Sequence, residues 1–505
     1  MRNAEKRSAF GLTHLALTLP MLKKTAKVLG LTLAILVAAG GLLFLVGVRI
    51  VLDGGGMPQL QLARSADEHA EIIARHREAQ RASAPAPPTA PEPPARATGE
   101  PGSPIVPPEA VRAVDPIVSR PYWTDFRGPA RDGHYRQQTI RTDWPSSGLP
   151  PLWKQPVGGG YASFVAADGR AFTIEQRANE EVVAAYDVRT GRELWTHSSP
   201  TIFREGMGGD GPRATPTWHD GRLYAVGGTG ELRALDAATG RMLWRTDILE
   251  DAGASNLQWG MAAAPLVVDE NVIVLPGGGG GNSVVAYNRT TGRRAWSALD
   301  DTQAYSSPML VTLAGVRQIL VFSASRLMGL RPDSGAVVWE FPWTTQYGVN
   351  ASQPLLLDDR RVMISTGYGA GAAAIELAPD GSGGLAVKEL WRTNRMKNQF
   401  TSSVLHEGYI YGLDEAILAC LDAATGELKW KGGRYGYGQV LLADGHLIVL
   451  SEGGDLALVR AMPEKHTELV RFPAIEGKTW NHPAIVDGFL LVRNINEMAA
   501  FDLRR

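Results

Sequence analysis

Cysteine is almost absent from this chain of 505 residues, which contains only Cys420. One cysteine cannot form an internal disulfide or a cysteine-based metal cluster, and no CxxCH sequence for haem attachment is present. No cysteine near the N-terminus could carry a lipid anchor. Export from the cytoplasm remains compatible with this composition, because a domain with a large core folds without disulfides.

Three further features are missing from the sequence, and each absence argues against a class of function. Acidic and basic residues nearly cancel, 52 against 51, so no overall charge indicates nucleic acid or anionic lipid as a partner. The ten histidines include no pair at metal-ligand spacing, so no metal site is predicted. No GxSxG element is present. The glycine run Gly277–Gly281 lies between two strand patterns, which indicates a hairpin loop and not a phosphate site.

One long apolar run lies near the N-terminus. Val28–Val48 contains no charge, and a helix of that length rises about 31 Å, enough for a hydrocarbon layer of about 30 Å. Lys23, Lys24 and Lys27 precede it. The positive-inside tendency therefore predicts a cytoplasmic basic N-terminus (1–27), an uncleaved signal-anchor helix (28–51) in the inner (cell) membrane, and the rest of the chain in the periplasm. A cleaved signal peptide is the alternative, but the run is longer than a usual signal core and lacks a small-residue cleavage site.

Residues 52–121 connect this helix to the rest of the chain. Ser65–Ala82 is rich in helix formers with mixed charge, and it is predicted to form a short solvated helix. Pro85–Pro121 holds 12 of the 32 prolines, a composition that favours a disordered, extended linker over a packed core. At about 3.1 Å per residue this segment would reach on the order of 115 Å, so it is expected to act as a stiff tether.

The remaining residues, 122–505, repeat the motif Ala-x-Asp-x-x-Thr-Gly-x-x-x-Trp. Each copy follows an inner strand that often opens with proline and a turn that contains glycine. Four short strands per repeat are typical of a β-propeller blade. A weaker copy ends at Trp339, and degenerate copies end at Trp391 and Phe472. The clear copies are Ala185–Trp195 (AYDVRTGRELW), Ala234–Trp244, Ala286–Trp296 and Cys420–Trp430.

Each position of the motif has a structural role. The Asp or Asn side chain accepts hydrogen bonds from the turn that follows it, and Gly takes the left-handed conformation that closes the hairpin. Trp is expected to fill the gap between neighbouring blades. In the clear copies these positions are Asp187, Gly191, Trp195, Asp236, Gly240, Trp244, Asn288, Gly292, Trp296, Asp422, Gly426 and Trp430.

The spacing of the outer aromatic residues predicts an all-β, eight-bladed propeller of four-stranded antiparallel blades. Trp153 has no motif before it, and Ala500-Phe501-Asp502 has no outer strand after it. The Leu152–Lys154 strand is therefore expected to close the ring by pairing with the C-terminal strands, which leaves no open sheet edge. The outer positions, 39 to 52 residues apart, are Trp153, Trp195, Trp244, Trp296, Trp339, Trp391, Trp430 and Phe472.

These motifs resemble the pyrroloquinoline-quinone-type (PQQ-type) propeller repeat over roughly residues 122–505. Quinoprotein alcohol dehydrogenases share this repeat with the non-catalytic outer-membrane assembly factor BamB. The resemblance implies the fold more strongly than the function, because one repeat serves both catalysts and scaffolds.

The chain departs from the catalytic members of the resemblance. Those enzymes carry an adjacent cysteine pair beside the quinone, and some carry a haem domain; Cys420 alone provides neither. Their calcium is held by carboxylates and amides, and no local motif here assigns such a set. PQQ with calcium is therefore not assured as a cofactor, although it stays open.

The candidate ligand site lies in the loops between blades, which gather on one face around the central channel. Arg, Asn, Gln and aromatic side chains converge there, which suits an anionic or planar polar ligand. The alternative is a network in which these side chains bond one another and rigidify the funnel. The candidate residues are Arg204, Glu205, Arg213, Asn256, Trp259, Tyr305, Gln346, Asn350, Asn394, Arg395, Arg434, Tyr437, Lys478, Trp480 and Asn481.

The preferred function is that of a binding or scaffold protein, anchored in the membrane, with a periplasmic protein or a small polar ligand as partner. A PQQ-dependent dehydrogenase of alcohols or sugars that uses the central funnel is the alternative. A third hypothesis is a sensor that binds a sugar or peptide there without turnover.

Overall fold

The computed structural model describes residues 19–45, 47–62, 65–83, 122–381 and 384–505. The chain divides into two compact units. The smaller unit holds the residues up to Leu52 together with Met57–Ser65, and the larger unit holds Asp53–Gly56 and Ala66–Arg505. The predicted proline-rich linker, Pro85–Pro121, lies outside the described residues.

The smaller unit consists of one helix and one hairpin. Helix α1 spans Leu19–Leu45, and its part Lys27–Leu45 is apolar and long enough to cross a bilayer. Strands β1 (Val48–Leu52) and β2 (Pro58–Leu62) pair in antiparallel register. The predicted helical end at residue 51 is wrong, because Gly47 has a φ of 90° after the helix and Val48–Leu52 pairs with a second strand.

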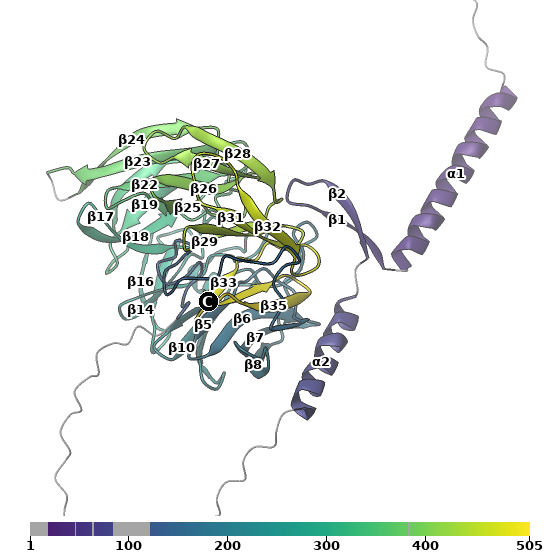
Figure 1. Ribbon diagram of the computed structural model, residues 1–505, viewed down its shortest axis with the longest axis horizontal. Helices are drawn as coiled ribbons and strands as arrows, with labels where there is room; N and C mark the ends of the chain where they lie inside the picture. Colours follow the sequence, from purple (N-terminus) through teal and green to yellow (C-terminus); the bar gives the residue numbers. More distant parts are fainter. Residues whose placement is uncertain (1–18, 46, 63–64, 84–121, 382–383) are drawn as a thin grey trace, which may run out of the picture. The chain divides into compact units, whose positions relative to one another are not determined.

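The larger unit contains the propeller, with eight sheets that each have four antiparallel strands, one of them extended by a fifth, parallel strand (Figure 1). This confirms the predicted fold. Blade 1 contains β5 (Val165–Ala167), β6 (Arg170–Arg177), β7 (Glu180–Asp187) and β8 (Glu193–Ser199). Blade 2 contains β9 (Thr217–His219), β10 (Arg222–Val226), β11 (Glu231–Asp236) and β12 (Met242–Asp247), and the short helix α3 (Ile248–Ala252) follows. Blade 3 contains β13 (Leu266–Val268), β14 (Asn271–Val274), β15 (Val284–Asn288) and β16 (Arg294–Ala298).

The next three blades repeat the same order. Blade 4 contains β17 (Met309–Leu313), β18 (Val316–Phe322), β19 (Arg326–Leu330) and β20 (Val337–Pro342). Blade 5 contains β21 (Leu355–Leu356), β22 (Arg361–Thr366), β23 (Gly371–Pro379) and β24 (Leu385–Thr393). Blade 6 contains β25 (Val404–His406), β26 (Tyr409–Asp414), β27 (Ile417–Asp422) and β28 (Leu428–Arg434).

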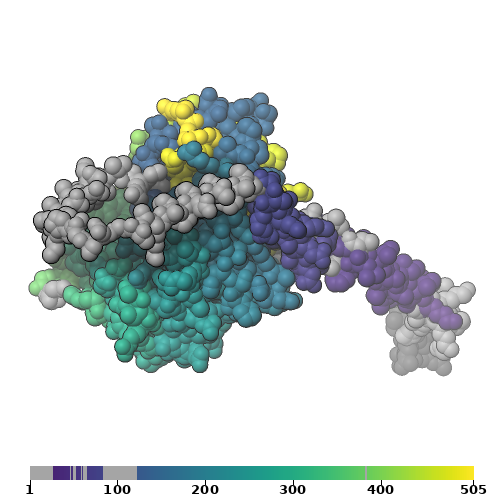
Figure 2. Space-filling view, turned by 90° about the horizontal axis from the view of Figure 1, so that it is seen from below, coloured from purple at the N-terminus to yellow at the C-terminus, as the bar shows by residue number. Residues whose placement is uncertain are grey.

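The last two blades include strands from the start of the domain. Blade 7 contains β29 (Gln439–Ala443), β30 (His446–Leu450), β31 (Asp455–Arg460) and β32 (Glu468–Pro473), with β3 (His134–Tyr135) added to its inner strand. Blade 8 contains β33 (Ala484–Val486), β34 (Phe489–Arg493) and β35 (Glu497–Asp502). Its outer strand is β4 (Trp153–Pro156), which pairs antiparallel with β35. The C-terminal residues and the first blade adjoin in Figure 2, in yellow and blue.

At five of the blade junctions, a tryptophan on the outer strand donates a hydrogen bond to the next blade. Trp153 donates from Nε1 to the carbonyl oxygen of Val188, one blade on, over 2.9 Å. A Cβ built on the motif glycine Gly191 would lie 2.7 Å from the Trp153 ring, so this position has no room for a side chain. Four other tryptophans donate from Nε1 to a backbone carbonyl oxygen of the next blade in the same way. These pairs are Trp195 with Ala237, Trp244 with Arg289, Trp391 with Ala423, and Trp430 with Met462.

The weak copy at Trp339 departs from this arrangement. Its indole Nε1 donates to the Gln318 side chain within blade 4, and the ring covers Gly329 of the same blade. Trp339 still packs in a hydrophobic cluster that contains side chains of both blade 4 and blade 5, as predicted, and only the hydrogen bond to the next blade is missing. The reason is the missing side chain at Gly329, which leaves a space that the ring fills.

The first segment of the domain crosses the central channel. Trp123 forms a bridge with Ala166 of blade 1, and β3 pairs in parallel with β29 of blade 7. Blades 1 and 7 are separated only by blade 8, but Arg131, which lies between these two contacts in the sequence, reaches carbonyl oxygens of blades 3 and 4 on the other side of the ring. The segment therefore crosses the channel.

Two buried arginines from this segment fill the channel. Arg131, 3% exposed, donates to the carbonyl oxygens of Pro265 and Pro308 at 2.5 and 2.9 Å. Arg127, 1% exposed, donates to the carbonyl oxygen of Ser403 at 2.7 Å. These carbonyls precede or open the inner strands of blades 3, 4 and 6, so the two side chains tie distant blades together. Burial lowers the pKa of Arg127 to about 10.

Helix α2 (Ala66–Ala82) packs on blades 8 and 1. Ile73 and Arg77 are 1% and 2% exposed. Arg77 donates to the carbonyl oxygen of Pro156 at 2.8 Å and to the carboxylate of Glu193 at 3.2 Å. The predicted helix is present, but the expectation that it is solvated is wrong. The mixed charge pattern did not predict a buried side, because one of its charged residues, Arg77, is itself buried and bonds to a carboxylate and a carbonyl.

Candidate functional site

The candidate site lies on the face where each outer strand ends and the next inner strand begins. The turns between second and third strands reach the same face, because successive strands in a blade are antiparallel. Side chains from several blades meet there. We call this the funnel face, and its opposite carries the turns between first and second strands.

Four aromatic rings form a continuous platform on the funnel face. Trp480 lies 4.4 Å from Phe400 and 5.0 Å from Tyr161, measured between ring centroids. Phe400 lies 5.8 Å from Tyr437. We call Tyr161, Phe400, Tyr437 and Trp480 the aromatic platform. Its rings come from loops before blades 1, 6, 7 and 8, so the platform spans the seam of the ring.

Glu452 is held at the edge of this platform. It lies in the turn between β30 and β31, and its Oε1 accepts a hydrogen bond from Trp480 Nε1 at 2.9 Å. Its Oε2 accepts from the backbone N–H of Tyr437 at 3.1 Å. Both oxygens are therefore positioned by the platform itself.

Lys478 is buried beneath the platform at 6% exposure. Its Nζ lies 3.8 Å from the centroid of the Trp480 ring and donates to the carbonyl oxygen of Gly208 at 3.1 Å. Burial lowers the pKa of Lys478 to about 8, while Glu452 and Glu205 act in the opposite direction. This cation supports the loops and the ring above it.

Arg213 is also engaged inside the funnel face. Its guanidinium donates to the carbonyl oxygens of Gly209 and Gly211 and lies 4.5 Å from the centroid of the Phe203 ring. Burial lowers the pKa of Arg213. The guanidinium of Arg213 is thus bound to loop carbonyls.

A peptide turn of the chain itself lies on this site. Gly54 donates from its backbone N–H to Glu452 Oε1 over 2.7 Å. Its carbonyl oxygen accepts from Gln399 Nε2 at 2.8 Å. A Cβ on Gly54 would overlap the ring of Tyr437, so the ring packs directly on the main chain. Both polar main-chain atoms of one buried glycine are satisfied by side chains of the propeller.

The structure divides the sequence-predicted residues into groups. Tyr437, Lys478 and Trp480 meet at the platform. Trp259 and Tyr305 form a second aromatic pair, with ring centroids 5.6 Å apart. Asn350 and Asn481 are buried, and their amides donate to backbone carbonyls. Glu205 accepts from the backbone N–H groups of its own loop. The exposed candidates, which join no shared cluster among the described residues, are Arg204, Asn256, Gln346, Asn394, Arg395 and Arg434.

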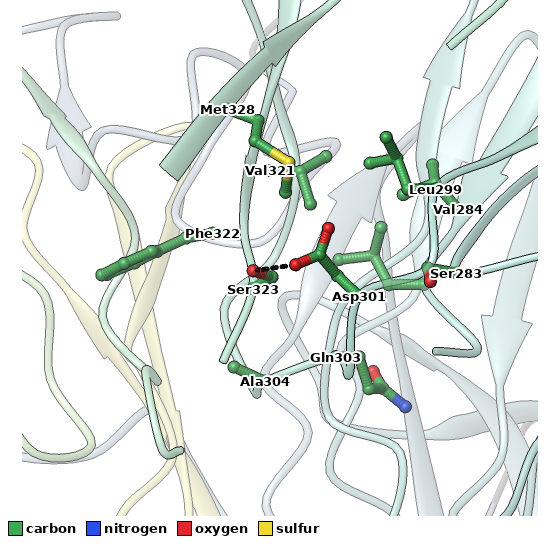
Figure 3. Close-up of a pocket in the computed structure, with 11 residues that line it drawn as sticks. Ser283, Val284, Leu299, Asp301, Gln303, Ala304, Val321, Phe322, Ser323 and Met328 are labelled. Carbon is green, nitrogen blue, oxygen red and sulfur yellow. Dashed lines mark hydrogen bonds between the residues drawn. The ribbon is translucent and has the colours of Figure 1, made fainter. Parts of the chain in front are cut away.

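A narrow hollow lies between blades 3 and 4. Figure 3 shows the carboxylate of Asp301 directed at Ser323, with Leu299, Val321 and Met328 nearby. The carboxylate already accepts from Arg326 Nε at 3.1 Å and from Ser325 Oγ at 2.9 Å. Its charge and hydrogen-bonding capacity are used within the fold, so this hollow is a packing feature.

Sequence reasoning missed Tyr161, Phe400, Glu452 and the Asp53–Gly56 turn. Glu452 lies in a turn between the second and third strands, whereas only loops between blades were considered. The sequence Ser451-Glu452-Gly453-Gly454 is a turn signal, and the antiparallel order of the strands places it on the funnel face. That reasoning would have found Glu452. The turn at Gly54 was concealed because the preceding strand continued an apolar run.

The comparison with known proteins identifies the family. A model described as "Outer membrane protein assembly factor BamB" matches residues 178–432, about half of the chain. The chain belongs to this family. A BamB of Bordetella pertussis is 24% identical over 221 residues, which cover 43% of this chain and 52% of the relative. The chain thus spans about half the length of that relative.

Two further similarities concern the fold and the repeat. The quinohemoprotein alcohol dehydrogenase of Comamonas testosteroni is 34% identical over 142 residues, 27% of this chain and 19% of the enzyme. Its crystal structure has a TM-score of 0.56 at 15% identity and covers 76% of this chain and 80% of the enzyme chain. The structure of BamB from Moraxella catarrhalis has a TM-score of 0.52 at 14% identity, covering 70% of this chain and 99% of that one.

The residues of the funnel face do not fit a quinone with calcium. Among the described residues, no group of three or more His, Cys, Asp or Glu could hold a metal ion. Cys420 is buried in blade 6, and its pKa is raised by burial to about 12. Lys478 and Arg213 donate to loop carbonyls, and Arg127 and Arg131 occupy the channel. No reaction step is therefore assigned to this cofactor.

Proposed function

We propose that this chain is a membrane-anchored, extracytoplasmic binding protein whose propeller receives a polypeptide partner on the funnel face. The observation that carries the proposal is the recognition of main-chain atoms by Glu452 and Gln399 at the platform. Side chains that satisfy a peptide N–H and a peptide C=O suit a polypeptide better than a small substrate.

The family supports the same function. Relatives of this chain are named outer membrane protein assembly factors, and such a name describes a protein that works through contacts with other proteins. The apolar helix Lys27–Leu45 supports attachment to a membrane. The basic residues Lys23, Lys24 and Lys27 support an orientation with the N-terminus in the cytoplasm.

A dehydrogenase is the second candidate, favoured by the 142-residue similarity to the quinohemoprotein. A titration with PQQ and calcium separates the two functions. The full chain in detergent is mixed with micromolar quinone, and a bound-quinone spectrum and dye reduction with alcohols and sugars are recorded. The proposal predicts neither signal. Stoichiometric quinone binding with turnover would overturn it.

A further inference from the structure

We propose that the aromatic platform with Glu452 and Gln399 is a receptor for a glycine-containing peptide turn of a partner protein, and that the chain's own Asp53–Gly56 turn competes for it. This inference rests on the proposed function and adds to it the chemistry of the ligand and a means of control.

The site binds the main-chain N–H and C=O of one residue. Glu452 accepts the N–H of Gly54, and Gln399 donates to its carbonyl oxygen, at 2.7 and 2.8 Å. The two side chains come from different blades. A ligand must therefore present both polar atoms of one peptide residue, in an orientation that a turn provides.

The site excludes every residue larger than glycine at that position. A Cβ on Gly54 would overlap the Tyr437 ring, whereas on Gly55 it would lie 3.3 Å from the Tyr437 hydroxyl and from Asp53 Oδ1. Gly56 has a φ of 80° and no neighbour within 4 Å of a built Cβ. Gly54 is thus required by contact and Gly56 by conformation. Gly55 is the position that tolerates change with small adjustment.

The receptor is formed before any turn binds. Glu452 is fixed by Trp480 Nε1 and by the N–H of Tyr437, at 2.9 and 3.1 Å. Trp480 is supported by Phe400 and by Lys478 beneath it. None of these contacts involves residues 53–56, so release of the turn leaves the carboxylate and the rings in position.

Occupancy by the internal turn and by a partner is mutually exclusive. Gly54 is buried against Tyr437 and uses Glu452 Oε1. With an intramolecular competitor, the apparent affinity for a partner falls in proportion to the fraction of time that the site is open. Displacement of the turn therefore converts a closed receptor into an open one.

A peptide titration tests this inference. The probe is a fluorescent peptide with the sequence of residues 50–58 between two added cysteines, which are joined by a disulfide. Its anisotropy is measured with the full chain in detergent. In the chain, Gly54→Val expels the internal turn and leaves the receptor intact, so peptide affinity should rise at least tenfold. Gly55→Ala is the matched control and should behave as wild type.

Two further titrations test whether the site is specific for a glycine turn. In the Gly54→Val chain, Glu452→Ala should weaken the peptide at least tenfold, with thermal melting as a check of folding. A peptide with valine at the position of Gly54 should not bind. Equal affinity of both peptides, or no gain from Gly54→Val, would overturn the inference. The proposed function is tested separately with a photo-crosslinking amino acid at Tyr347, which is exposed on the funnel face. Capture of a protein partner there would leave the proposed function standing even if this inference fails.

Discussion

Trp195 on the outer strand of blade 1 donates from its indole nitrogen to the carbonyl oxygen of Ala237 in blade 2, 3.1 Å away. The same ring lies against Gly240, the motif glycine of blade 2, which has a φ of 74°. One aromatic side chain thus satisfies a turn carbonyl and fills the space that a glycine leaves. Through this contact, residues of the sequence motif hold neighbouring blades together.

Because of this contact, Gly240→Ala should lower the free energy of unfolding by more than the cost of the left-handed backbone alone. A left-handed alanine costs about 1 kcal/mol, and overlap with the Trp195 ring adds about 1–3 kcal/mol. Gly221→Ala in the same blade is the control, since Gly221 has a φ of 71° and nothing within 4 Å of a built Cβ. Denaturant unfolding should find Gly240→Ala the more destabilised variant. Equal losses would contradict the role of the ring.

Removal of residues 497–505 should unfold the whole propeller and not one blade. These residues include β35, which pairs with β34 on one side and with β4 on the other. Loss of β35 leaves β4 without a partner and opens the ring. Thermal melting followed by circular dichroism measures the effect. A truncated protein with unchanged, cooperative melting would contradict closure of the ring through blade 8.

Arg77→Ala should destabilise the larger unit by about 1–3 kcal/mol, because it removes a buried, charge-assisted hydrogen bond and the donor to Pro156. Arg75 lies on the same helix and is exposed, so Arg75→Ala should change the free energy of unfolding by less than about 0.5 kcal/mol. Urea unfolding compares the two. Equal values would show that α2 contributes nothing through Arg77.

Glu175 predicts a dependence of stability on acid pH. Burial alone would raise its pKa, but Arg177, Arg493 and Arg77 together lower it to about 2, from 4.5. The carboxylate therefore stabilises the folded state above pH 4.5, and this contribution is lost as the pH falls through about 2. Glu175→Gln should be less stable than wild type at pH 7, with a difference that shrinks toward pH 2.

The exposed Glu180, at the start of the same strand β7, provides the control for this experiment. Glu180→Gln should follow the wild-type unfolding curve at every pH. A difference between Glu175→Gln and wild type that stays constant from pH 7 to pH 2 would contradict the low pKa of Glu175.

The number and order of the blades could be predicted from the sequence because their cause is local and repeated. The Asp–Gly–Trp spacing reports one hairpin per blade, and the bulky residue at the end of each copy marks an outer strand. The degenerate copy at Phe472 kept only that last signal, yet β32 lies where its spacing requires.

The candidate site could be predicted only in part, because its contacts join loops that are far apart in sequence. Lys478, Trp480 and Tyr437 could be chosen from the sequence by their residue types, but the residues that they contact could not. Glu452 resembles any surface glutamate in sequence, and Gly54 follows a strand that continues an apolar run. A buried glycine in contact with a ring from residue 437 leaves no periodic signal.

The central claim is that the funnel face binds a protein, and photo-crosslinking tests it most directly. A benzophenone amino acid replaces Tyr347, which is 62% exposed on the funnel face, or Asp220, whose side chain is 81% exposed on the opposite face. Membranes that contain the full chain are irradiated and crosslinked products are identified. The account predicts a discrete protein adduct from Tyr347 and none from Asp220. Adducts from Asp220 alone, or equal adducts from both faces, would contradict it.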